Sequence, residues 1–210
     1  MNEYEAIRLR YGFELPEPYR SLRDAGHLDA PPSQNHLAFY DCEWLSLRAI
    51  AEYSFNEWEI TGDGMFVPFA ITGRHEPYCW RLDWESGAEP PIVLCERCES
   101  GICLAPDFRG FLYRMALEAF AGRNDFLGDA KVEELHQTVN ILASLLPAHW
   151  AQQLRDLRGR PWQKDEKRGC LFILPQPECD AIIAAELTFP HLNEVFIHDK
   201  EYLKRQKQGD

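Results

Sequence analysis

The chain has 210 residues, of which 45% are hydrophobic and 12% aromatic, enough to bury the core of one compact domain with at most one sizeable extension. Its 34 acidic and 22 basic side chains give a formal net charge of −12, which disfavours binding to the phosphate backbone of nucleic acids. The longest apolar run, 141–146, is far short of the roughly 20 residues that cross a bilayer, and the first ten residues lack the apolar stretch of a signal peptide. We therefore expect a cytoplasmic protein that binds neither nucleic acid nor membrane.

The N-terminal segment predicts two short helices, over 2–10 and from Pro16 to about Gly26. A loop over 27–36 and a short strand over 37–40 follow. The next apolar stripe predicts a helix that begins at Asp41 as its N-cap. The residues of this stripe are Trp44, Leu47, Ile50 and Ala51.

The middle of the chain predicts an antiparallel meander, because short β-prone runs alternate with glycine- and proline-containing turns. The expected strands cover 65–70, 78–83, 92–95 and 102–105. The strand over 78–83 alternates cleanly, with Tyr78, Trp80 and Leu82 on one face.

Residues 107–122 carry the strongest helical periodicity and predict a core helix that covers the sheet, capped by Asp107 and ended by Gly122. Its apolar stripe consists of Phe108, Phe111, Leu112, Met115, Ala116, Ala119 and Phe120. We expect Trp80, Phe108, Phe111 and Leu112 to be buried.

After a linker over 123–129, the remaining residues predict a C-terminal α/β extension. Two helices lie before and after Pro147, a strand covers 170–174, a helix begins at Pro177 and a last strand covers 195–197. The predicted fold class is therefore α+β, with a mainly antiparallel or mixed sheet, helices packed around it and this extension. The predicted domains are a core over 1–122 and an extension over 123–210, packed on the core.

Seven cysteines, an odd number placed in apolar stretches, indicate reduced thiols in a reducing compartment. Cys95, Cys98 and Cys103 have a spacing that resembles part of a zinc site, and Cys79 could supply the fourth ligand from a neighbouring strand. However, Cys95 lies inside a predicted strand and no second CxxC pair follows. We interpret these residues as free thiols and expect no metal and no cofactor.

Motifs typical of catalysis are missing from the sequence. There is no HExxH, phosphate-binding loop or GxSxG, and no carboxylate pair stands at an obvious strand end or helix face. The basic stretch 155–168 contains Trp162 and could contact nucleic acid. Acidic residues within it cancel part of its charge, so we interpret it as a solvated helix end and loop.

Several short motifs occur in an order that resembles one known family. They are Tyr11-Gly12-x2-Leu15-Pro16-x2-Tyr19, the run 62–70 (GDGMFVPFA), Tyr78-Cys79-Trp80-Arg81-Leu82-Asp83, Pro90-Pro91-Ile92-Val93 and Asp107-Phe108-x2-Phe111-Leu112. Residues 1–122 resemble the SUKH superfamily of bacterial toxin-immunity proteins, named in part after a fungal regulator of cell-wall synthesis. The chain departs from the family at 74–77, where Arg-His-Glu-Pro replaces the usual Gly-Asp before the aromatic strand.

The resemblance implies an α+β fold and a protein-binding role without catalytic residues, most often immunity to a secreted nuclease or other toxin. The acidic charge of this chain agrees with a basic toxin domain as partner, because summed charge steers association. We expect acidic residues of the sheet segment to form the binding face: Glu57, Glu59, Asp63, Glu76, Asp83, Glu85 and Glu89. A regulatory or scaffold module of the same fold and a thiol-dependent enzyme acting through Cys79 or Cys98 remain the alternatives.

Overall fold

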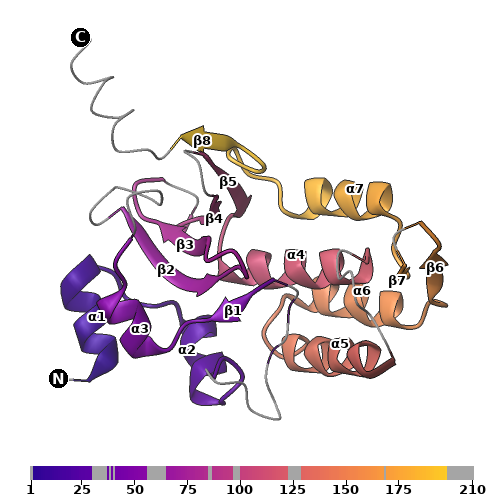
Figure 1. The fold of residues 1–210 in the computed structure, drawn as a ribbon, viewed down its shortest axis with the longest axis horizontal. Helices are drawn as coiled ribbons and strands as arrows, with labels where there is room; N and C mark the ends of the chain where they lie inside the picture. The colour runs from indigo at the N-terminus through magenta and orange to yellow at the C-terminus, as the bar shows by residue number, and fades with distance from the viewer. Residues whose placement is uncertain are drawn as a thin grey trace, which may run out of the picture. The chain divides into compact units, whose positions relative to one another are not determined.

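The fold is α+β, as the sequence predicts, and is described here from a computed structural model (Figure 1). The structure describes residues 2–29, 37, 39, 41–55, 65–84, 87–96, 100–122, 129–167 and 169–197. The chain forms two compact units: residues 1–36, 41–108 and 189–210 make the first, and residues 37–40 and 109–188 make the second.

The first unit contains a six-stranded antiparallel sheet whose strand order is β1-β2-β3-β4-β5-β8. Figure 1 shows the last strand returning from the C-terminal part of the chain to pair with β5. The strands are β1 (Glu43–Trp44), β2 (Phe66–Ile71), β3 (Pro77–Arg81), β4 (Ile92–Cys95), β5 (Ser100–Ala105) and β8 (Val195–Ile197). The four central strands match the predicted meander within one or two residues at nearly every end.

One face of the sheet is built from aromatic rings around Trp80, which is fully buried. The Trp80 ring lies 4.5 Å from that of Phe69 and 5.2 Å from that of Tyr19, centroid to centroid. The ring of Phe108, the first residue of α4 (Phe108–Phe120), lies 5.8 Å from Trp80 and 5.3 Å from Tyr19. Offset and edge-to-face ring pairs add stability beyond the burial of their area, so this cluster fixes helix α2 (Glu17–Asp24) against the sheet.

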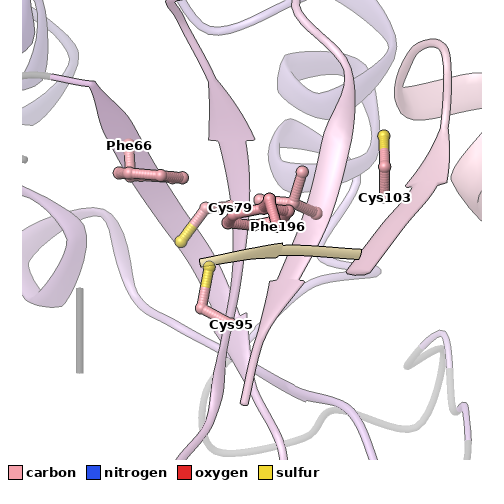
Figure 2. Packing of buried hydrophobic residues seen from close by; sticks show 6 residues of the cluster. Phe66, Cys79, Cys95, Cys103 and Phe196 are labelled. Atoms are coloured by element: carbon pink, nitrogen blue, oxygen red, sulfur yellow. The ribbon is translucent and has the colours of Figure 1, made fainter. Parts of the chain in front are cut away.

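The opposite face carries smaller side chains and sulfur atoms (Figure 2). The buried residues of this cluster are Phe66, Cys79, Val93, Cys95, Cys103 and Phe196. Phe196 reaches it because Gly101 lies opposite in β5: a Cβ atom at Gly101 would lie 2.4 Å from the Phe196 ring and 2.8 Å from the carbonyl oxygen of Leu94. The Phe196 ring can therefore pack on β5 only because residue 101 is a glycine without a Cβ atom.

Three short helices belong to the first unit: α1 (Glu3–Tyr11), α2 (Glu17–Asp24) and α3 (Leu47–Glu52). The Asn2 side chain caps α1 by accepting a hydrogen bond from the Glu5 N–H, as expected for an N-cap. The Arg10 guanidinium donates to the carbonyl oxygens of Ala51 and Tyr53, at the C-terminal end of α3. Since a helix end has unpaired carbonyl groups, Arg10 both caps α3 and ties α1 to it.

The helix predicted from Asp41 begins later than expected. Trp44 lies in β1, paired with Ala70 of β2 and buried against Phe69. Ser46 is the N-cap of α3, and its hydroxyl accepts from the Ala49 N–H. Asp41 instead adopts a positive φ of 51° and accepts a hydrogen bond from the Gly73 N–H. The gain from adding Trp44 to the sheet outweighs the local helical pattern, which is a weak preference.

The second unit is mainly helical. Its elements are α4 (Phe108–Phe120, from Arg109 onward), α5 (Asp129–Leu142), α6 (Ala148–Arg158), the hairpin β6 (Gln163–Asp165) and β7 (Cys170–Phe172), and α7 (Gln176–Glu186). The Tyr113 ring of α4 stacks on Trp150 of α6 with centroids 4.6 Å apart. The Phe120 carbonyl accepts hydrogen bonds from the Ile173 and Leu174 N–H groups, which follow β7. The hairpin partner β6 was missed, because its polar sequence lies within the basic stretch.

These units divide the chain differently from the predicted domains 1–122 and 123–210. The boundary falls at the first turn of α4, and the described residues 189–197 belong with the sheet. The reason is the pairing of β8 with β5, a contact between segments more than 90 residues apart in the sequence.

Replacing Phe111 by Ala should lower the free energy of unfolding by about 3–5 kcal/mol, because the ring is fully buried. Trp80, Phe108 and Leu112 are fully buried as well, as the sequence predicts. Equilibrium urea denaturation followed by tryptophan fluorescence measures the change. A loss below about 1 kcal/mol would contradict a core position for this ring.

Gly101→Ala should destabilise the protein by about 1–3 kcal/mol, because the added methyl group meets both the Phe196 ring and a backbone carbonyl. The matched control is Gly159→Ala at the end of α6. The Cβ atom there would make only ordinary contacts, and the backbone φ of −77° suits alanine. Equal effects of the two substitutions in the same denaturation experiment would show that Phe196 does not depend on Gly101.

Candidate partner-binding surface

Acidic residues are concentrated in the segment that builds the sheet. Residues 41–108 contain thirteen acidic and four basic side chains, a net of −9 of the total −12. Residues 109–188, most of the second unit, contain eleven acidic and ten basic side chains, a net of −1. The negative potential of the protein therefore originates mainly from one of its two units.

Three of the seven acidic residues predicted to bind a partner lie within the described residues: Glu76, Asp83 and Glu89. Glu57, Glu59, Asp63 and Glu85 lie outside them. Glu76 precedes β3 and Asp83 follows it, so the two carboxylates stand at opposite ends of a strand, about 20 Å apart along the chain direction. Glu89 precedes β4, the antiparallel neighbour of β3, and therefore lies at the Asp83 end. The structure does not bring these three residues into one patch.

Each of the three carboxylates also takes part in local structure. Glu76 accepts a hydrogen bond from the Thr72 hydroxyl across the β2–β3 turn. Glu89 accepts one from the N–H of Phe108, at the start of α4. Asp83 binds Arg81 through two contacts, Nε to Oδ1 at 3.0 Å and Nη2 to Oδ2 at 3.2 Å. Their charge is partly used within the fold, which lowers their expected share in partner binding.

Sequence reasoning missed a cluster around Arg81. The guanidinium carbon lies 3.6 Å from the ring centroid of Trp84 and 4.4 Å from that of Phe196. The His191 ring stacks on Trp84 at 4.2 Å, and its Nδ1 lies 2.6 Å from a carboxylate oxygen of Glu194. The Arg-x-Asp-Trp sequence at 81–84 could have indicated the contacts of Arg81 with Asp83 and Trp84. The contact of Trp84 with His191 could not be predicted, because it depends on the pairing of β8 with β5. The cluster fixes the turn before β8 to the end of β3.

The cysteines of the sheet are arranged unlike zinc ligands. Val93 stands between Cys79 and Cys103 in the strand register, so these two residues are two strands, about 10 Å, apart. Two thiolates that share one zinc ion lie within about 5 Å of each other. The thiols instead contact backbone carbonyl oxygens, Cys79 that of Pro77 and Cys103 that of Ile92. Among the described residues no group of three or more candidate ligands could hold a metal ion, and Cys98 lies outside them.

The described cysteines have the surroundings of structural rather than reactive thiols. All six are free and buried: Cys42, Cys79, Cys95, Cys103, Cys170 and Cys179. Burial, with a smaller contribution from Asp41 and Glu43, raises the pKa of the Cys42 thiol well above its usual value. A raised pKa reduces the thiolate that acts as nucleophile.

Three of the six basic side chains in the stretch 155–168 form contacts within the second unit. Arg158 donates to the Asn140 side chain, and Arg160 forms an ion pair with Glu178 at 2.8 Å. Lys164 pairs with Glu166 at 3.1 Å. The stretch contains the end of α6 and strand β6, where the sequence predicts a solvated helix end and loop.

No described helix is both long and apolar enough to cross a membrane. Comparison with models of protein families, with curated proteins and with solved structures finds no match to this chain.

The purified protein should contain no stoichiometric zinc, and EDTA should leave its melting temperature unchanged. The physical reason is the separation of Cys79 and Cys103 by the strand of Val93. Elemental analysis and thermal unfolding make the two measurements. One zinc per chain that disappears in Cys95→Ser would overturn this prediction and restore the zinc site.

Proposed function

We propose that this chain is a non-catalytic binding protein that neutralises a cognate toxin with a basic, nuclease-like domain. The observation that carries the proposal is the concentration of −9 of the −12 net charge in residues 41–108. A charged surface of this kind raises the rate of encounter with a basic partner by up to about 10³-fold. The resemblance of residues 1–122 to SUKH immunity proteins supports the same role.

An acidic partner suits a nuclease for a simple electrostatic reason. A nuclease binds the phosphate backbone of its substrate with a basic surface. Carboxylates held on the turns and ends of a rigid sheet can occupy that surface in place of the phosphates. Rigid display lowers the entropy lost on binding, because the side chains need less ordering.

A thiol-dependent enzyme is the less favoured alternative. Cys79 is fully buried and hydrogen-bonded to a backbone carbonyl, so a substrate cannot reach it without opening the sheet. A regulatory or scaffold module of the same fold would use the same acidic surface on another basic partner. The position of the gene for this chain separates the two binding roles: a place directly downstream of the gene for a large secreted toxin favours immunity.

Reversing acidic residues of the sheet segment should slow association with the cognate toxin domain, which the proposal requires and which is to be sought in the gene next to this one. The variant Glu57→Lys, Glu59→Lys, Glu85→Lys avoids the three carboxylates that stabilise local structure. We expect association to be about 10–100-fold slower at low salt, and its salt dependence to be weaker. Stopped-flow fluorescence over a range of salt concentrations measures both.

The matched control reverses three acidic residues of the second unit: Glu133→Lys, Glu134→Lys and Asp180→Lys, all exposed. Both variants change the formal net charge from −12 to −6, so a difference between them reports where the charge lies. Equal association rates of the two variants would remove the electrostatic part of the proposal. Failure of the wild-type chain to bind the toxin domain or to inhibit it would remove the immunity role.

A further inference from the structure

A hollow of about 250 Å³ lies between α1, α2 and the segment that connects them. Its apolar part is formed by Leu15, which is buried, and by the ring of Tyr4. Small-molecule sites are typically about 300–1,000 Å³. At about 250 Å³ this hollow lies near the lower end of that range, with room for an apolar side chain and the flanking part of a protein loop.

Four charged side chains line the hollow: Glu5, Arg8, Glu14 and Arg20. In the part of the chain that the structure describes, none of these four side chains forms an ion pair or a side-chain hydrogen bond, although both signs are present. Elsewhere in the same unit an exposed pair of this kind does form, between Arg48 and Glu52 at 3.1 Å. The charged groups of the hollow thus keep their hydrogen-bonding capacity for water or for a partner.

The walls of the hollow are fixed by contacts that leave its interior open. The Tyr4 hydroxyl donates to a carboxylate oxygen of Asp24 at 3.0 Å and so joins α1 to the end of α2. Tyr11 donates to the carbonyl oxygen of Ile50, which with the Arg10 contacts joins α1 to α3. A hollow formed in advance binds with less loss of entropy than one that must be ordered.

Helix α1, which forms one wall of the hollow, also carries an exposed apolar side chain. Leu9 is 65% exposed, and only Val195 and Ile197 share this property among the large hydrophobic residues that the structure describes. In α1 it lies one turn after Glu5, a residue that lines the hollow. A preformed hollow whose apolar part is ringed by unpaired charges resembles a protein-binding hot spot, in which an anchor side chain fills a pocket inside a polar rim.

We propose that this hollow is the docking site for a protruding loop of a protein partner. The loop presents one apolar anchor, which enters between Tyr4 and Leu15, flanked by one acidic and one basic side chain. Arg8 and Arg20 take the acidic group, and Glu5 and Glu14 take the basic group. The inference rests on the proposed binding function and assigns to it a second, specificity-determining surface. The four charges sum to zero, so this surface selects a partner by pattern and adds nothing to long-range steering.

The test uses a disulfide-closed library of random peptides, selected by display on the full-length chain. The enriched peptides should carry an apolar residue flanked by opposite charges. Their affinity, measured by fluorescence anisotropy, should fall at least about tenfold for the double variant Glu5→Arg with Arg8→Glu. This exchange keeps the net charge of −12 and inverts only the local pattern.

The matched control exchanges another helical pair, Arg48→Glu with Glu52→Arg in α3, and should leave the affinity unchanged. If the α1 exchange impairs folding, as judged by its melting temperature, Glu14→Gln with Arg20→Gln tests the same hollow. Peptides that lack the charge pattern, that bind the hollow and control variants equally well, or that fail to enrich at all would overturn the proposal.

The failure of this inference can be told apart from that of the proposed function. The same exchange is measured against the toxin domain of the neighbouring gene. Toxin binding that responds to charge reversal in 41–108 but not to the α1 exchange removes the hollow and retains the immunity role. Peptides that respond to the exchange, on a chain that does not bind the toxin domain, retain the hollow and remove the immunity role.

Discussion

The structure of the first unit depends on strand β3 being buried on both faces. Trp80 and Cys79 are neighbours in sequence, point to opposite sides of the sheet and are both fully buried. A strand of this kind needs cover from two directions. Tyr19 and Phe108 supply rings on the Trp80 side, while Phe196 from the C-terminal segment covers the Cys79 side. The sheet therefore requires segments from both ends of the chain.

That requirement also limits where the charge can lie. Since both faces of the central strands are apolar, the described acidic side chains of residues 41–108 lie outside strands β2 to β5: Glu43 is in the edge strand β1, Glu52 ends α3, and the others lie in turns and connections. A buried charge without a partner costs several kcal/mol. Arg81 is a largely buried charge at the end of β3. Asp83 neutralises it, and three aromatic rings surround its guanidinium. The segment thus combines apolar strands, which bury the sheet, with acidic residues outside those strands, which give the unit its charge.

The central elements could be predicted from the sequence, since α4 has a sustained helical period and β2 to β5 are short β-prone runs bounded by glycine- and proline-containing turns. The failures have a common cause in contacts between distant residues. Trp44 joins the sheet because Ala70 and Phe69 are there to receive it, and β8 pairs with β5 because Gly101 leaves room for Phe196. Local patterns carry no information on such partners. Hairpin strand β6 was missed because its side chains are polar and its pairing with β7 is the only signal.

The candidate sites also combine features that the sequence alone shows with features that depend on contacts between distant residues. The acidic composition of the sheet segment could be read directly, because net charge needs no coordinates, but the position of each carboxylate could not. Glu76 and Asp83 are separated by the length of β3, and the hollow between α1 and α2 exists only because Tyr4 meets Asp24, twenty residues later. In the two proposals, charge that acts at long range and charge that acts by contact therefore belong to different residues. Since summed charge governs the rate of association and local contacts govern dissociation, a partner can be attracted by the sheet segment and selected by the helices, each independently of the other.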